Sequence, residues 1–106
     1  MTTHTKTILR QLRSGLNSLY GPRLRGVYLF GSYARGEEDA ESDLDVLIIL
    51  DQIPRYGVEI DYTGQLISEL SLQSGISISR VFVSEQDWAG RQTAFLANAR
   101  EEAIAA

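Results

Sequence analysis

A glycine–serine turn and a nearby pair of aspartates are the residues of this sequence best suited to chemistry. The turn is Gly-Ser-Tyr-Ala-Arg-Gly, residues 31–36, and the aspartates are Asp43 and Asp45. A turn of small residues lets backbone amides approach a phosphate closely, and amides that open a helix favour an anion. Two neighbouring aspartates can hold a divalent cation. Together these residue types indicate chemistry on a nucleoside triphosphate.

The two aspartates open an apolar run, residues 46–50, that has the composition of a buried strand. Residues two apart on a strand project from the same face, with Cα atoms roughly 6–7 Å apart, so the carboxylates of Asp43 and Asp45 can converge. Oxygen ligands favour Mg²⁺ or Mn²⁺ over zinc, and Mg²⁺ often takes one or two carboxylates together with substrate phosphates. The pair therefore predicts a site for Mg²⁺ or Mn²⁺.

The candidate nucleotide-binding residues are Gly31, Ser32 and Arg35. Gly31 lets the backbone approach a ligand, Ser32 offers a hydroxyl, and Arg35 can add a charge-assisted contact to a phosphate oxygen. Each of these residues taken alone is more often an ordinary turn or surface residue. Their occurrence with both aspartates between residues 31 and 45 indicates one shared site.

Hydrophobic periodicity predicts alternating helices and strands around this site. Gly21-Pro22 ends the first helix, Gly75 ends the second long helix, and Ser84 caps the start of a last helical pattern that continues to the end of the chain, with Gly90 as a potential interruption. On that last pattern, Glu101 and Glu102 are expected to form a solvated face. The expected segments are a helix at 5–20, a strand at 23–30, a short helix at 33–36, a strand at 44–50, a loop at 51–57, a helix at 58–73 and a strand at 76–84.

Composition sets broad limits on the class of protein. With 106 residues, 43% hydrophobic content and a net charge of -4, the chain is expected to form a single domain, residues 1–106, and nucleic acid is an unlikely broad partner. There are no cysteines, so disulfides and thiolate metal sites are excluded. The first residues lack the apolar core of a signal peptide, and no apolar run approaches membrane-spanning length, so we expect a cytoplasmic protein without a membrane partner.

Residues 31–36 and 42–48 resemble the signature of the DNA polymerase beta-like nucleotidyltransferases. The similarity is strongest to the minimal nucleotidyltransferases of prokaryotes, and its specific part covers residues 30–50. The resemblance implies an α+β fold with a small mixed β-sheet and helices packed on one face. The order of the remaining expected elements is compatible with that family over most of the chain.

The resemblance also implies a reaction. Asp43 and Asp45 would hold Mg²⁺, while Gly31 and Ser32 would hold the β- and γ-phosphates. The enzyme would transfer a nucleoside monophosphate, AMP from ATP in our leading interpretation, to a hydroxyl of a protein or a small molecule. Some minimal members act as antitoxins that modify a tyrosine of a small helical HEPN-type toxin. The expected partners are therefore a nucleoside triphosphate and such a helical protein, and a homo-oligomer is an open alternative.

The sequence departs from the family pattern at one position. Active members usually carry a third carboxylate on the next strand, where it helps to bind metal and acts as a general base toward the acceptor hydroxyl. The matching strand here has no Asp or Glu, and the expected position falls at Ser79 or Val81. Three carboxylates after the second strand are candidate substitutes: Asp51, Glu59 and Asp61.

The missing carboxylate supports a second interpretation, which is a degenerate member that binds nucleotide or a helical partner without turnover. A third interpretation is an unrelated small α/β domain in which the aspartates are accidental. The first two interpretations share the site at Gly31, Asp43 and Asp45 and differ in whether transfer occurs, whereas the third lacks the site.

Overall fold

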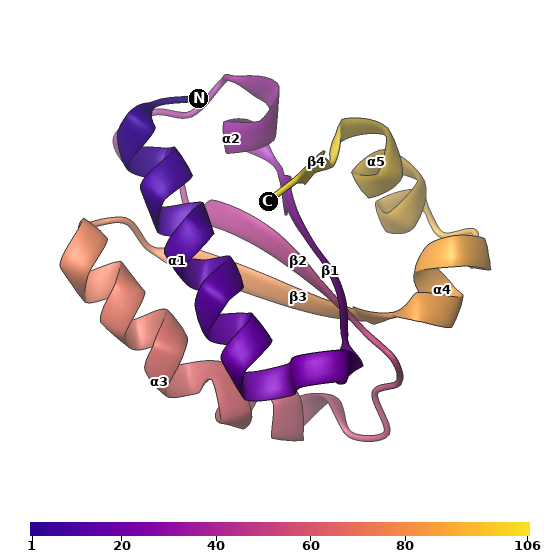
Figure 1. The fold of residues 1–106 in the computed structure, drawn as a ribbon. Helices are drawn as coiled ribbons and strands as arrows, with labels where there is room; N and C mark the ends of the chain where they lie inside the picture. Colours follow the sequence, from indigo (N-terminus) through magenta and orange to yellow (C-terminus); the bar gives the residue numbers. More distant parts are fainter.

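A four-stranded sheet forms the centre of the computed structural model, which describes residues 1–106 (Figure 1). The strand order is β3-β2-β1-β4; β1 is antiparallel to both β2 and β4, whereas β2 and β3 are parallel. The predicted α+β fold with a mixed sheet is therefore confirmed. In chain order the elements are α1 (Thr3–Tyr20), a 3-10 turn (Gly21–Arg23), β1 (Leu24–Phe30), α2 (Ser32–Arg35), β2 (Leu44–Leu50), α3 (Tyr56–Ser74), β3 (Ile78–Ser84), α4 (Glu85–Gly90), α5 (Ala94–Glu102) and β4 (Ile104–Ala105).

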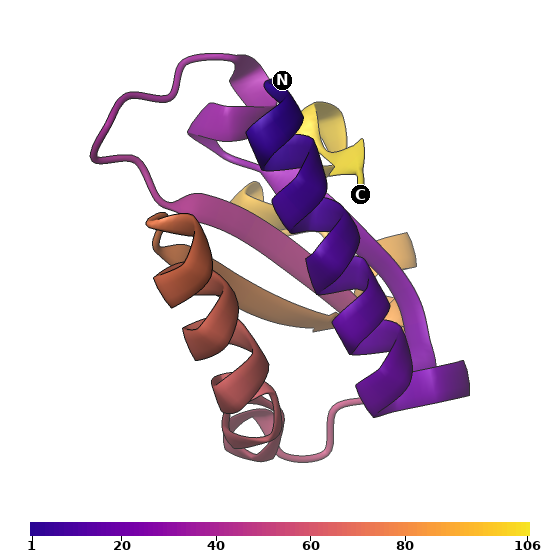
Figure 2. The ribbon, with the colours of Figure 1, turned by 60° about the vertical axis from the view of Figure 1, so that its left-hand side comes forward.

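The two long helices, α1 and α3, lie side by side across one face of the sheet (Figure 2). On α1 the apolar residues recur every three or four positions and form one stripe that faces the strands, whereas the buried face of α3 combines Ile67 and Leu70 with the polar Glu59 and Thr63. On α1 this stripe includes Leu12 and Leu16, which are fully buried against alternate residues of β1 and β2 such as Leu29 and Ile48. No helix combines the length and the apolar character that crossing a membrane requires.

The two short helices α4 and α5 lie against the opposite face of the sheet. Leu96 and Ala99 of α5 pack with Leu47 and Ile49 of β2, and Trp88 of α4 packs on Tyr28 of β1 with ring centroids 5.2 Å apart. The long helices thus cover one face, as expected, and the C-terminal helices add a smaller apolar cluster on the other. Because β2 is covered on both faces, its apolar run is nearly continuous.

Most predicted elements are confirmed within two residues, including the stops at Gly21 and Gly75 and the Ser84 cap. The expectation that the helical pattern continues through Ile104 is wrong. The chain leaves α5 in extended conformation at Ala103, and β4 pairs with β1, placing Ile104 beside Leu29. The edge of β1 offers unpaired backbone groups that a short extended segment can satisfy, and helical periodicity carries no signal of this long-range pairing.

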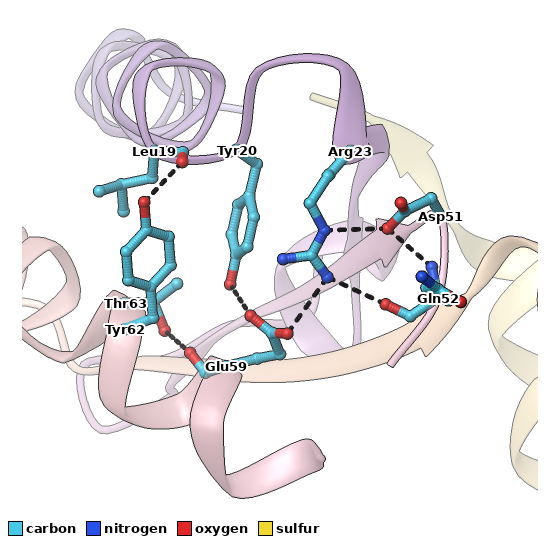
Figure 3. A network of polar contacts seen from close by, with 8 residues as sticks. All are labelled: Leu19, Tyr20, Arg23, Asp51, Gln52, Glu59, Tyr62 and Thr63. Atoms are coloured by element: carbon cyan, nitrogen blue, oxygen red, sulfur yellow. Dashed lines mark hydrogen bonds and ion pairs between the residues drawn. The ribbon is translucent and has the colours of Figure 1, made fainter. Parts of the chain in front are cut away.

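A buried polar network, here called the Arg23 cluster (Tyr20, Arg23, Asp51 and Glu59), ties α1, β2 and α3 together (Figure 3). Glu59, which is 4% exposed, accepts a hydrogen bond from the Tyr20 hydroxyl at 2.9 Å and one from Arg23 at 3.2 Å. Arg23 also donates to Asp51 at 3.1 Å. Each oxygen of the buried carboxylate has a donor, which compensates the cost of removing its charge from water. Burial, followed by the hydrogen bond to Glu59, raises the pKa of Tyr20.

Candidate nucleotide and metal site

The two aspartates stand at the N-terminal end of β2. Leu44 and Val46 are buried toward α1 and α3, so Asp45 between them points to the opposite face, where it is half-buried. Asp43 precedes the strand and is exposed. Burial, and then the neighbouring charge of Asp43, raises the pKa of Asp45. The predicted proximity of the two carboxylates is therefore present, and negative charge accumulates at this end of the strand.

Gly31 joins the end of β1 to the start of α2, directly beside Asp45. Its backbone has φ 75° and ψ -156°, a region that is essentially restricted to glycine. Phe30 pairs with Asp45 across the antiparallel strands, and a Cβ on residue 31 would overlap the Asp45 carboxylate. Both the backbone conformation and the available space therefore require glycine. The structure brings the Gly-Ser turn and the aspartates to one place.

Glu102, at the end of α5, also contacts the turn. Its Oε1 accepts a hydrogen bond from the Gly31 N–H at 2.9 Å, and its Oε2 pairs with Arg35 at 3.1 Å. The Gly31 N–H, and then Arg35, hold the pKa of Glu102 below its usual range despite some burial. Sequence reasoning assigned Glu102 to a solvated helix face. The contact depends on the return of the chain to the β1 edge, which no local pattern reveals.

The Arg35 guanidinium is also held by Glu37, at 3.3 Å. Sequence reasoning placed Arg35 against a phosphate, and in this structure the charge of Arg35 is shared between the carboxylates of Glu37 and Glu102. The arginine therefore lies at the expected end of the turn with its donors directed at anions. We call these three residues the Arg35 cluster.

The register between β2 and β3 decides which residue stands where the third carboxylate was expected. Asp45 pairs with Ser79 in the parallel ladder, so the Ser79 side chain lies beside Asp45 on the same face. Val81 lies one step further along that face, beside Leu47, and packs against the smaller apolar cluster. Ser79 therefore occupies the strand position closest to the aspartates.

The three proposed substitutes are wrong. Asp51 follows the far end of β2, roughly 20 Å along the strand from Asp45, and pairs with Arg23. Glu59 is locked to Tyr20 and Arg23 beneath the other face of the sheet. Asp61 is exposed on α3. No group of three or more His, Cys, Asp or Glu residues is arranged to hold a metal ion.

A hollow of about 470 Å³ borders the turn on the side of α5. Its volume lies within the range of small-molecule sites, about 300–1,000 Å³. Neither Asp43 nor Asp45 lines it. The lining residues are Phe30, Gly31, Arg35, Phe95, Asn98, Ala99, Glu101 and Glu102.

Solved structures share this fold. A toxin–antitoxin complex with AMP-PNP superposes with a TM-score of 0.64 at 19% identity, over 98% of this chain and 72% of that chain. A provisionally assigned nucleotidyltransferase from Sulfolobus solfataricus gives 0.62 at 18% identity, over 99% and 86%. At identities this low, a superposition is evidence for the fold alone. These superpositions confirm the predicted nucleotidyltransferase-like fold.

Sequence comparison is more specific. The nucleotidyltransferase domain family matches residues 9–102. Two proteins of Methanocaldococcus jannaschii, provisionally named protein adenylyltransferases, are 37% and 36% identical over 74% and 70% of this chain, and the matches cover 72% and 74% of their lengths. Protein adenylyltransferase MntA of Shewanella oneidensis is 30% identical over 80% of this chain and 60% of its own. Because the family match spans nearly the whole chain and carries the Gly-Ser turn and both aspartates, this protein belongs to the DNA polymerase beta-like nucleotidyltransferases.

Proposed function

We propose that this protein is a protein adenylyltransferase that transfers AMP from ATP to a hydroxyl of a partner protein. The observation that carries the proposal is the contact between the Gly31 backbone and the Asp45 carboxylate, which leaves no room for a Cβ. It puts the proposed phosphate donors beside the proposed metal-binding oxygens. The names of the related proteins support adenylyl transfer and a protein acceptor.

Asp43 and Asp45 are the proposed ligands of Mg²⁺ or Mn²⁺. Their all-oxygen donor set suits a hard cation, which would also offset the burial of the Asp45 carboxylate and its repulsion by Asp43, the two main causes of its raised pKa. Two carboxylates leave the other coordination positions to water and to phosphate oxygens. A bound divalent cation would neutralise triphosphate charge and polarise the α-phosphate.

The remaining residues of the site act on the phosphates. The Gly31 N–H and the Ser32 hydroxyl hold the β- and γ-phosphates, and Arg35 stabilises the charge that develops on departing pyrophosphate. The acceptor oxygen forms a bond to the α-phosphorus as the bond to the β-phosphate oxygen breaks. The hydroxyl proton passes to water or to a carboxylate of the acceptor protein, because β3 supplies no base. We therefore expect slow transfer by the isolated chain.

The proposed acceptor is a hydroxyl side chain of a toxin partner, so that this chain would act as an antitoxin. The likeness to toxin–antitoxin structures in fold and to MntA in sequence supports this assignment. The alternative is a binding module without turnover. Ser79 beside Asp45, where active relatives are expected to carry a carboxylate, is the observation that favours this alternative.

Calorimetry with ATP, with and without Mg²⁺, tests the site. Asp43→Asn/Asp45→Asn should lose the Mg²⁺-dependent part of ATP binding, because water and phosphate alone then hold the cation. Equal affinity in this variant and the wild type would remove the aspartates from the site.

A transfer assay with α-labelled ATP, with and without a candidate partner, separates the two functions. Ser79→Asp should raise transfer by about tenfold or more, since a general base typically contributes roughly 10²–10⁴-fold. Ser84→Asp is the matched control: it adds the same charge to the far end of β3, where Asp is an equally good helix cap. Tight ATP binding without transfer in any variant would favour the binding module.

A further inference from the structure

We infer that Glu102 is an internal competitor of the triphosphate, whose carboxylate occupies the phosphate donors of the Gly31 turn when no nucleotide is bound. The inference rests on the proposed function and adds a control on that same site. Glu102 accepts the Gly31 N–H at 2.9 Å and pairs with Arg35 at 3.1 Å. These are two of the donors assigned to the phosphates.

A carboxylate and a phosphate make equivalent demands on these donors. Each is an anion with several oxygens, and each forms short charge-assisted hydrogen bonds with an amide and a guanidinium. The Gly31 N–H is a single donor, so strong hydrogen bonds to Glu102 and to a phosphate are mutually exclusive. Arg35 is less restrictive, because its fork presents five N–H donors. The competition is therefore centred on Gly31.

The geometry distinguishes this role from that of the missing third carboxylate. Both oxygens of Glu102 are committed to donors, and Glu102 joins no metal-binding group with Asp43 and Asp45. Its charge nevertheless contributes to the raised pKa of Asp45. Glu102 therefore faces the phosphate side of the site and adds to its negative charge.

Release of Glu102 needs little rearrangement of the fold. Leu96 and Ala99 anchor α5 to the sheet, and the backbone N–H of Ala106 donates to Val27 at 2.9 Å, so the segment on both sides of Glu102 is held independently. The Glu102 side chain is 25% exposed, which leaves space for a new rotamer. A triphosphate can therefore displace the side chain alone, and its apparent affinity falls by the fraction of molecules in which Glu102 is bound to the turn.

Calorimetry with Mg-ATP and with Mg²⁺ and inorganic tripolyphosphate tests the competition. Glu102→Gln should bind both ligands about five- to tenfold more tightly, because the neutral amide competes less well for Gly31 and repels phosphate less. Glu101→Gln is the matched control, since it removes the same charge from the same helix and the same hollow, and only Glu102 of the two is bonded to Gly31 and Arg35. Its affinity should stay within about twofold of the wild type.

Equal or weaker binding by Glu102→Gln, with normal binding by the wild type, would overturn the inference and leave the proposed function intact. Reduced AMP transfer at unchanged affinity would also overturn it, because that result makes Glu102 a catalytic group. Failure of every protein to bind either ligand would overturn the proposed function, and the competition with it. The contact itself has a separate readout: the Gly31 amide resonance of the ligand-free protein should shift in Glu102→Gln and stay in place in Glu101→Gln.

Discussion

Two arginine clusters, each built on one arginine and two carboxylates, lie at opposite ends of the sheet. The Arg23 cluster lies where β1 begins and β2 ends, whereas the Arg35 cluster lies where β1 ends and β2 begins. Each arginine is held between two carboxylates at 3.1–3.3 Å. The Glu59 side chain is 6% exposed, and the side chains of Glu102 and Glu37 are 25% and 66% exposed. The buried Glu59, with the Tyr20 hydroxyl bound to it, separates the two clusters, since Asp51 is 29% exposed and the two arginines are 38% and 43% exposed.

This difference decides what each cluster can do. In the Arg23 cluster, loss of one partner strands buried polar groups, so the network fastens three elements together. In the Arg35 cluster, solvent screens the charges and replaces lost hydrogen bonds at little cost. In the inferred competition an incoming anion takes the place of Glu102, whereas Glu59 is held in the fold by its buried hydrogen bond to Tyr20. The same pairing stabilises the fold at one end of the sheet and stays exchangeable at the other.

Glu59→Ala should cause the largest loss of stability. The substitution removes the partner of the buried Tyr20 hydroxyl and one of the two carboxylates that hold Arg23. We expect it to lower the free energy of unfolding by about 2–4 kcal/mol. This is less than the loss of a fully buried ion pair can cost, because Arg23 keeps its contact with Asp51. Urea unfolding measures it, with exposed Glu69→Ala as the control. Affinity for Mg-ATP per folded molecule should not change. A cost below that of Glu69→Ala would contradict the structural role of the Arg23 cluster.

Gly31→Val should affect both stability and the site. The positive φ and the overlap with Asp45 predict a loss of about 2–3 kcal/mol together with a loss of nucleotide binding. Gly75→Val is the control, because Gly75 has φ 73° with open space around it. Gly75→Val should lose stability through backbone strain and retain nucleotide binding. Nucleotide binding by Gly31→Val at wild-type affinity would separate the turn from the site.

Asp45→Asn should raise the melting temperature in the absence of divalent cations, by about 2–4 °C. Burial, and then Asp43, raises the folded-state pKa of Asp45, so folding favours the protonated form. The corresponding stability is present at low pH and is lost as pH rises through the folded-state pKa, and at pH 7 the ionised group opposes folding. Thermal unfolding in EDTA measures the effect. Glu41→Gln, at an exposed position, should leave the melting temperature unchanged. An equal rise in the melting temperature of Glu41→Gln would show that the effect is not specific to Asp45.

Asp51→Asn should have the smallest effect, a small loss of stability near neutral pH that disappears in acid. Burial would raise the pKa of Asp51, but the Gln52 N–H and Arg23 outweigh it and hold that pKa below its usual range. Its stabilising contribution is present above the unfolded-state pKa of about 3.9 and is lost as pH falls through the folded-state value. Urea unfolding from pH 6 downward should show a flatter acid decline in Asp51→Asn than in the wild type. If the free energies of unfolding of the two proteins fall in parallel with pH, Asp51 does not contribute to the acid sensitivity of the fold.

The sequence alone predicted much of the fold and the two halves of the candidate site. Local signals suffice for α1, β2 and α3, since helical spacing, a branched apolar run and stop signals at Gly21 and Gly75 depend on residues close in the chain. The same holds for the pairing of Gly31 with Asp43 and Asp45. When two consecutive strands pair in antiparallel fashion, the end of the first lies beside the start of the second, which brings residue 31 next to residue 45.

Only the tertiary structure decided what surrounds that site. The register that sets Ser79 beside Asp45, the burial of Glu59 against Tyr20 and the return of Glu102 to Gly31 all join residues more than 30 positions apart. Periodicity describes which face of an element is apolar, but it carries no information about which distant element covers that face. The carboxylates at 59 and 102 therefore look alike as sequence. Their different surroundings bury Glu59 in the fold and leave Glu102 partly exposed at the turn, where we infer that it competes with a phosphate.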